Sequence, residues 1–215
     1  QIKALPTTGL RCKLILPFFM NNFITWINYF FRLRPALAEG QDFEVLVAPA
    51  FGRNHFADSE LHLIRQLYQD SHEFDFLTVS KLLDEGFEPG VPNREIAKLC
   101  QKIMDETKKP LIVQWEVACG FDQKWYENNF DNVYAVWPET KPGYFNTYNF
   151  AKQTEKILKS LNSKTLILIG HRYHLMRAGL IFKKLGFKPA AIEALEQFDS
   201  NSVQRFTRNK FNWML

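Results

Sequence analysis

Hydrophobic residues recur along the chain with two different periods, and these periods predict strands that alternate with helices. Continuous apolar runs of strand length fall at residues 43–49, 111–115, 133–137, 166–169 and 190–195. Apolar residues at helical spacing fall between the later runs, at about 93–106, 146–161 and 175–185. A short helix is expected at about 122–129, and a last helix is expected to begin after Asp199 or Ser200.

This alternation predicts a doubly wound, Rossmann-like α/β domain at residues 41–215, with a mainly parallel five-stranded sheet and helices on both faces. Ligands of such domains bind beyond the carboxyl ends of the strands, where the winding reverses. Helical patterns at 59–69 and 74–84 predict a helical insertion at about 54–92. This insertion either closes over the pocket or only covers a face of the sheet, and the sequence leaves both open.

Residues 1–40 predict an aromatic helical segment that packs on the domain. No charged residue occurs at 14–31, but Pro17 and several asparagines interrupt this stretch, which argues against a membrane span. We therefore expect a helix at about 18–33, with contact to a membrane surface as the less favoured alternative. The chain begins with Gln1, which indicates that a preceding segment is missing or was removed, so localisation is weakly constrained.

The charge pattern and the cysteines argue against several classes of function. The 27 basic and 23 acidic residues are interspersed, which is typical of a solvated surface and not of a nucleic-acid interface. Cys12, Cys100 and Cys119 lie far apart without a paired spacing. We therefore expect a reducing, cytoplasmic environment and neither a disulfide framework nor a bound metal.

The segment from Leu166 to Ala178 predicts a binding site, because a buried strand runs through Gly170 directly into a helix whose first turn is polar and basic. No Ser, Thr, Asp or Asn occupies positions 170–173 to cap this helix. Its first amides therefore lack a local acceptor and are expected to face an anionic ligand. His171 and His174 lie close together, but no third metal ligand occurs at a suitable spacing.

Other candidate residues follow the remaining strands, and each also has a purely structural interpretation. Gly52 and Arg53 form either an anion-binding turn or a plain turn after the first strand. Trp115 and Glu116 are expected at the rim after the second strand, where Glu116 is either a general base or a solvated carboxylate. Asn146 is expected mainly to cap the helix that follows the third strand.

Several of these segments together resemble the motif series of the YdcF/SanA/ElyC-like bacterial proteins of unassigned function. The similar segments are Asp42 to Val47 with the following glycine turn, Arg94-x-x-Ala97, Glu139 ahead of Asn146 to Ala151, and Tyr173 to Ala178. The resemblance covers roughly residues 42–200, and its two C-terminal motifs are the specific ones. The chain departs from the family pattern at Gly170-His171 and at Trp115 to Val117, where the family usually has smaller residues.

The resemblance implies a Rossmann-like fold with the first and fourth strands adjacent, so that the turns at Gly52-Arg53 and Gly170-His171 flank one crevice. It also implies a nucleotide-like or S-adenosylmethionine ligand and a link to envelope metabolism. The positions that match the family motifs are Arg94, Glu139, Asn146, Thr147, Asn149, Tyr173, His174 and Arg177.

Two classes of function follow from these residues. The first is an enzyme acting on a phosphorylated or nucleotide-linked small molecule, with His174 or Glu139 in acid-base work and Arg177 on the anion. The second is a binding or regulatory module without turnover. The P-loop, G-x-G-x-x-G, G-x-S-x-G and H-E-x-x-H motifs are all missing from the sequence, which argues against the enzyme classes that they define.

Overall fold

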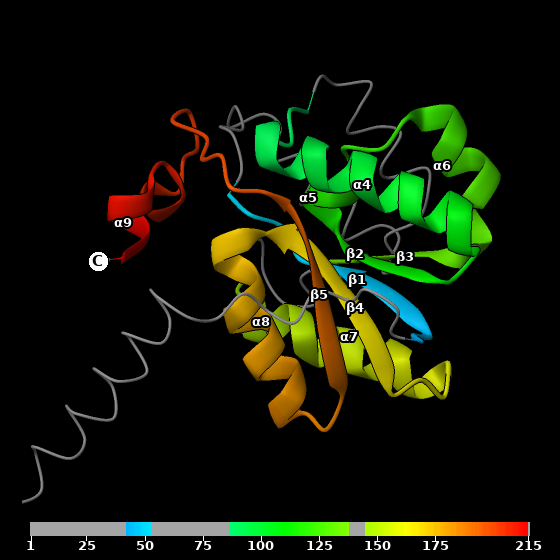
Figure 1. Cartoon of the computed structure of the whole chain (residues 1–215). Helices are drawn as coiled ribbons and strands as arrows, with labels where there is room; N and C mark the ends of the chain where they lie inside the picture. Colours follow the sequence, from blue (N-terminus) through cyan, green and yellow to red (C-terminus); the bar gives the residue numbers. More distant parts are fainter. Residues whose placement is uncertain (1–41, 53–86, 138–144, 215) are drawn as a thin grey trace, which may run out of the picture. The chain divides into compact units, whose positions relative to one another are not determined.

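A computed structural model describes residues 42–52, 87–137 and 145–214, all of which belong to one compact unit that spans residues 35–215 (Figure 1). The predicted N-terminal helix, the helical insertion, Arg53 and Glu139 lie outside the described residues. The strands are β1 (Val45–Ala48), β2 (Leu111–Gln114), β3 (Val133–Val136), β4 (Thr165–His171) and β5 (Lys188–Leu195). The helices are α4 (Val91–Thr107), α5 (Trp115–Ala118), α6 (Gln123–Asn129), α7 (Thr147–Ser160), α8 (Arg172–Lys184) and α9 (Lys210–Met214), with two 3₁₀ turns, η1 (Phe130–Asn132) and η2 (Arg205–Thr207).

The five strands form one parallel sheet in the order β3-β2-β1-β4-β5, which confirms the predicted doubly wound fold. The central strand β1 pairs with β2 on one side and with β4 on the other, as the resemblance implied. The chain therefore reverses its winding direction at β1 and β4. Their carboxyl ends meet at the position where ligands of this fold class bind.

Successive residues of β1 point to opposite faces of the sheet, and each face carries its own core. Leu46 and Ala48 belong to the core that includes residues of α4 and α5, whereas Val45 and Val47 belong to the core that includes residues of α7 and α8. Figure 1 shows these helix pairs on opposite sides of the sheet. Because every residue of β1 is fully buried, the strand reads as a continuous apolar run without alternation.

Side-chain caps explain where two of the helices begin. The Asn146 side chain accepts a hydrogen bond of 2.9 Å from the backbone N–H of Asn149, so the predicted cap of α7 is confirmed. Asp122 caps α6 in the same way through the N–H of Trp125. At the carboxyl end of α4, Lys108 adopts a left-handed conformation with φ of 56° and ends the helix.

The structure corrects three predicted boundaries. The second strand ends at Gln114, and Trp115 already begins α5. Gly170 and His171 belong to strand β4 and do not form a turn. The helix predicted to start directly after Asp199 or Ser200 is not formed there. The Asp199 side chain accepts a hydrogen bond from the N–H of Asn201, and the hydroxyls of Ser202 and Thr207 bond to each other at 2.7 Å. These local side-chain bonds compete with helix formation, so the last helix is α9 alone.

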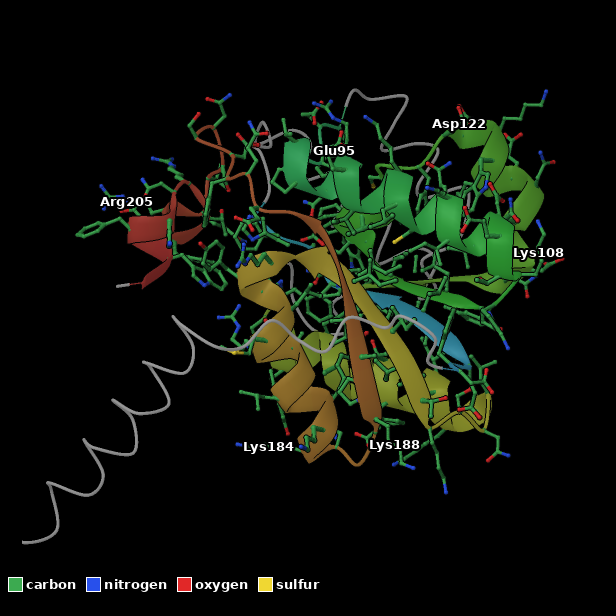
Figure 2. All side chains as sticks on the ribbon, in the orientation of Figure 1. Glu95, Lys108, Asp122, Lys184, Lys188 and Arg205 are labelled. Carbon is green, nitrogen blue, oxygen red and sulfur yellow. The ribbon has the colours of Figure 1, made fainter. Side chains whose placement is uncertain are left out.

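Charged side chains are spread around the domain. Figure 2 shows Glu95, Lys108 and Asp122 on the side of α4 and α6, while Lys184 and Lys188 lie at the amino end of β5. Arg205 belongs to η2, near α9. Among the described residues, every helix is too short or too polar to cross a bilayer.

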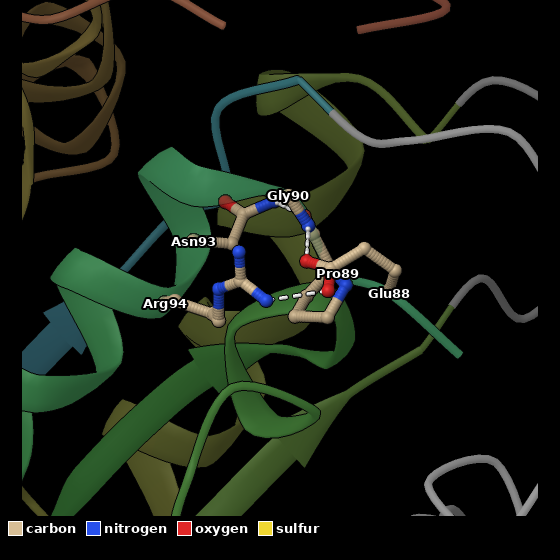
Figure 3. A network of polar contacts seen from close by, with 5 residues as sticks. All are labelled: Glu88, Pro89, Gly90, Asn93 and Arg94. Atoms are coloured by element: carbon tan, nitrogen blue, oxygen red, sulfur yellow. Dashed lines mark hydrogen bonds and ion pairs between the residues drawn. The ribbon is translucent and has the colours of Figure 1, made fainter. Parts of the chain in front are cut away.

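The turn after β1 is held by one fully buried amide, Asn93, in the first turn of α4. Its Oδ1 accepts a 2.8 Å hydrogen bond from the N–H of Phe51, and its Nδ2 donates to the carbonyl oxygens of Gly52 at 2.9 Å and Pro89 at 2.7 Å. Figure 3 shows Asn93 beside Pro89 and Gly90 at the start of α4. Asn93 therefore fixes the direction in which the chain leaves β1.

We predict that Asn93→Leu lowers the free energy of unfolding by about 3 kcal/mol or more, because it leaves three buried backbone groups without their partner. Urea unfolding followed by circular dichroism measures the loss. The control is Asn128→Leu on α6, where the residue is exposed and the expected change is within about 0.5 kcal/mol. Equal losses in the two variants would contradict this account of the turn.

Candidate functional site

A pocket that is partly open to solvent lies at the carboxyl ends of β1 and β2, against the start of α7 and beside His174 and Arg177 of α8. The described residues that line it are Ala50, Phe51, Gly52, Gln114, Glu116, Phe145, Thr147, His174, Arg177, Gln204, Phe206, Thr207 and Trp213. Its position is the topological switch point between β1 and β4. The pocket therefore lies where the fold class predicts a ligand site.

Three polar side chains form a connected group in the wall of this pocket. The Thr147 hydroxyl oxygen lies 2.8 Å from Nε2 of His174 and accepts a 3.0 Å hydrogen bond from Nη2 of Arg177. Thr147 is the first residue of α7, and the other two are one helical turn apart on α8. Parallel packing of α7 against α8 on the same face of the sheet thus brings together residues that are about thirty positions apart in sequence.

Two buried imidazoles stay neutral at pH 7. Burial, together with the charges of Arg177 and His171, lowers the pKa of His174 to about 3, although the backbone of Ala50 offsets part of the effect. Burial also lowers the pKa of His171 to about 4, and the backbone of Gln197 offsets part of that. Among the lining residues named above, Arg177 carries a permanent positive charge.

The C-terminal segment forms one wall of the pocket. The indole of Trp213 lies over the Arg177 guanidinium, with 4.9 Å between Cζ and the ring centroid, and packs on Phe51 and Phe206. At Gly52, where φ is 72°, an added Cβ would lie 2.7 Å from Oγ1 of Thr207. Glycine at this turn therefore permits both the positive φ and the close approach of the C-terminal segment.

The structure brings five of the predicted site residues to the pocket wall, namely Gly52, Glu116, Thr147, His174 and Arg177. Glu116 is 4% exposed, so its carboxylate is a buried group and not a solvated one. The expectation that the Gly52 and Gly170 turns flank one crevice holds only for Gly52. Gly170 is buried in β4, where an added Cβ would lie 3.2 Å from the side chain of Leu175.

The first turn of α8 lies among aromatic rings. No side chain caps the helix, as the sequence predicts, and His171 is its N-cap residue. The His171 ring stacks on Phe51 with 3.7 Å between centroids and meets Phe198 edge-on, while Tyr173 lies tilted on Phe198. Residues 170–173 are not among the described residues that line the pocket, which faces His174 and Arg177 instead.

The remaining predicted residues have structural contacts. Arg94 forms an exposed ion pair with Glu88, which also accepts from the N–H of Gly90 (Figure 3). Asn146 caps α7 through Asn149, which is exposed. Trp115 is buried between Phe87 and Trp137.

Sequence reasoning missed most of the C-terminal wall. Phe206 and Trp213 line the pocket although they belong to a basic C-terminal run that includes Arg205, Arg208 and Lys210. Two aromatic residues among basic ones were the available signal. Gln114 also lines the pocket, and its Oε1 accepts a 3.1 Å hydrogen bond from the N–H of Ala50 that supports the turn after β1.

The part of the chain described in the structure holds no group of three or more His, Cys, Asp or Glu side chains that could bind a metal ion. Cys100 and Cys119 are buried free thiols, and burial raises the pKa of each. In comparisons with known protein families, curated proteins and solved structures, nothing matches this chain. The geometry of the pocket is therefore the basis for assigning a function.

We predict that the protein loses stability as the pH falls from 7 to 5. The pKa values of His171 and His174 are lower in the folded protein than the ordinary 6.5, so the unfolded chain binds more protons in this range and stability falls with pH. Each histidine contributes a loss of about 2 kcal/mol between pH 7 and pH 5. Urea unfolding at the two pH values measures it.

The variant His171→Phe tests the assignment, because phenylalanine keeps the stacking on Phe51 and cannot be protonated. We expect unchanged or higher stability at pH 7 and a pH dependence reduced by about 2 kcal/mol. An undiminished pH dependence in this variant would show that His171 does not contribute.

Proposed function

We propose that the pocket at the carboxyl ends of β1 and β2 binds a nucleotide-like or phosphorylated small molecule. The observation that carries the proposal is the Arg177 guanidinium in the pocket wall, bonded to Thr147 at the switch point of the sheet. Arginine has five N–H donors in a planar fork that matches phosphate or carboxylate oxygens, and the bond to Thr147 uses one of them. The Thr147 bond and the Trp213 ring hold the guanidinium in a defined orientation.

The neighbouring groups support an anionic ligand. Thr147 begins α7, so an anion beside it lies near the partial positive charge of a fourteen-residue helix. The neutral His174 ring adds a polar contact without a charge. The motif similarity of residues 42–200 to the YdcF/SanA/ElyC-like proteins supports the same proposal. On the basis of this similarity, the proposal includes a role in bacterial envelope metabolism.

A second candidate is a nucleoside ligand without phosphate, such as S-adenosylmethionine, bound either for catalysis or by a regulatory module. The buried carboxylate of Glu116 favours it, because a carboxylate soon after the second strand of a doubly wound sheet is the usual acceptor for ribose hydroxyls. Phe51, Phe145 and Phe206 supply aromatic surface in the same pocket.

We predict that an anionic ligand raises the melting temperature of the protein and that Arg177→Gln abolishes this effect. At a hundredfold excess over its dissociation constant, a ligand stabilises the protein by about 2.7 kcal/mol. A thermal-shift titration with inorganic phosphate, AMP and a nucleotide sugar measures the effect. The control is Arg172→Gln on the same helix, because Arg172 pairs with Glu196 and does not line the pocket. Equal stabilisation of Arg177→Gln and the wild type would reject Arg177 as the anion-binding group.

The second candidate predicts a different pattern in the same titration. S-adenosylmethionine or adenosine would stabilise the wild type, and Glu116→Gln would weaken that stabilisation by about 1–3 kcal/mol, because one hydrogen-bond partner of the ribose loses its charge. Stabilisation by phosphate but not by adenosine would reject the second candidate.

A further inference from the structure

The Thr147 hydroxyl lies in the pocket wall without being needed for the helix that it begins. Asn146 caps α7, so the hydroxyl of Thr147 has no capping role. Thr147 is 6% exposed and lines the pocket. Its hydroxyl contacts two side chains, and of these only the His174 ring can accept a hydrogen bond. A buried hydroxyl within 2.8 Å of an imidazole has the geometry of a nucleophile beside its base.

The donors and acceptors of this group fix the direction of its protons. Arg177 can only donate, so its 3.0 Å bond occupies one lone pair of the Thr147 oxygen. The neutral His174 ring carries one proton, and its Nδ1 has no hydrogen-bond partner among the described residues. A proton on Nε2 would leave the Thr147 hydroxyl proton without an acceptor among its side-chain partners, so the ring proton is assigned to Nδ1. Nε2 is then the acceptor, and the Thr147 hydroxyl donates to it. The oxygen keeps a second lone pair for an electrophile.

We propose that Thr147 is the nucleophile of a phosphoryl-transfer reaction in this pocket, with His174 as the group that receives its proton. This inference rests on the proposed function, namely that the pocket binds a phosphorylated small molecule. It goes further, because it assigns turnover and a covalent intermediate.

The surroundings of His174 favour a phosphoryl group over a neutral acyl group as the electrophile. An imidazolium beside the Arg177 guanidinium is disfavoured as long as the pocket holds no added negative charge. A phosphoryl group brings that charge, so proton transfer to His174 becomes less costly only with such a ligand bound. Phosphoryl transfer also passes through a loose transition state in which the attacking hydroxyl needs little help from a strong base.

The proposed reaction balances with water as the only co-reactant. The Thr147 oxygen forms a bond to phosphorus, the bond between phosphorus and the leaving oxygen breaks, the hydroxyl proton passes to Nε2 of His174, and the leaving oxygen takes a proton from solvent. Water then attacks phosphorus from the opposite side and releases a proton to solvent, the bond to Thr147 breaks, and His174 returns its proton to the Thr147 oxygen. The net change is hydrolysis of a phosphate ester or anhydride to an alcohol or acid and inorganic phosphate.

The test incubates the full chain with acetyl phosphate, a small phosphoryl donor, at pH 7. Released acetate and phosphate are measured, and acid-quenched protein is analysed by peptide mass spectrometry. We expect an acid-stable phosphothreonine at Thr147, or phosphate release that Thr147→Val lowers at least about 100-fold. Thr147→Ser keeps the hydroxyl and should retain activity within about tenfold.

The matched control is Thr154→Val, a fully buried threonine on the same helix that does not line the pocket. It should behave as the wild type. Adduct or phosphate release that persists in Thr147→Val, an acid-labile adduct on histidine, or an acetyl adduct on Thr147 would each overturn the assignment.

A parallel thermal-shift titration with inorganic phosphate separates the two proposals. Stabilisation of the wild type that depends on Arg177, without adduct or release, would overturn the role of Thr147 and leave the proposed binding function intact. Loss of both stabilisation and reaction would overturn the two together.

Discussion

One buried side chain, Asn93, determines the geometry on which the pocket depends. Its three hydrogen bonds hold the N–H of Phe51 and the carbonyls of Gly52 and Pro89, so the chain leaves β1 in a single direction. That direction gives Gly52 its positive φ and places the turn against the C-terminal segment. Asn93 does not line the pocket, yet it sets the position of one pocket wall. A different path of the turn would leave buried backbone groups without hydrogen bonds, which would lower the stability of the fold.

The chemistry of the pocket follows from burial more than from the number of charges. His174 and His171 lie in surroundings that disfavour a proton on either ring, and Arg177 lies beside the first of them. Such groups lower the stability of the folded chain at mildly acidic pH, and strongly perturbed groups of this kind gather at functional sites. The connection from Arg177 through Thr147 to His174 joins a permanent cation to a neutral ring through one hydroxyl.

The fold was predictable because its signals are local. The apolar runs of β1, β2 and β4 and the Asn146 cap are read directly from neighbouring residues, and the adjacency of β1 and β4 was implied by the motif resemblance. The candidate site was predictable only in part. Thr147, His174 and Arg177 were recognised from motifs, but Trp213 reaches them through a contact between distant segments that no local periodicity encodes. The sequence indicates that the first turn of α8 has no side-chain cap, but it does not reveal the aromatic rings that pack around this turn.

The C-terminal wall has a consequence for biosynthesis. The five strands are complete once the ribosome has released residue 195, whereas Phe206, Thr207 and Trp213 emerge later. A nascent chain can therefore assemble its sheet before the pocket exists, and no ligand of that pocket can assist the early steps of folding. Any fusion partner or truncation that displaces Trp213 would remove one wall of the pocket and uncover the part of the core that contains Phe51.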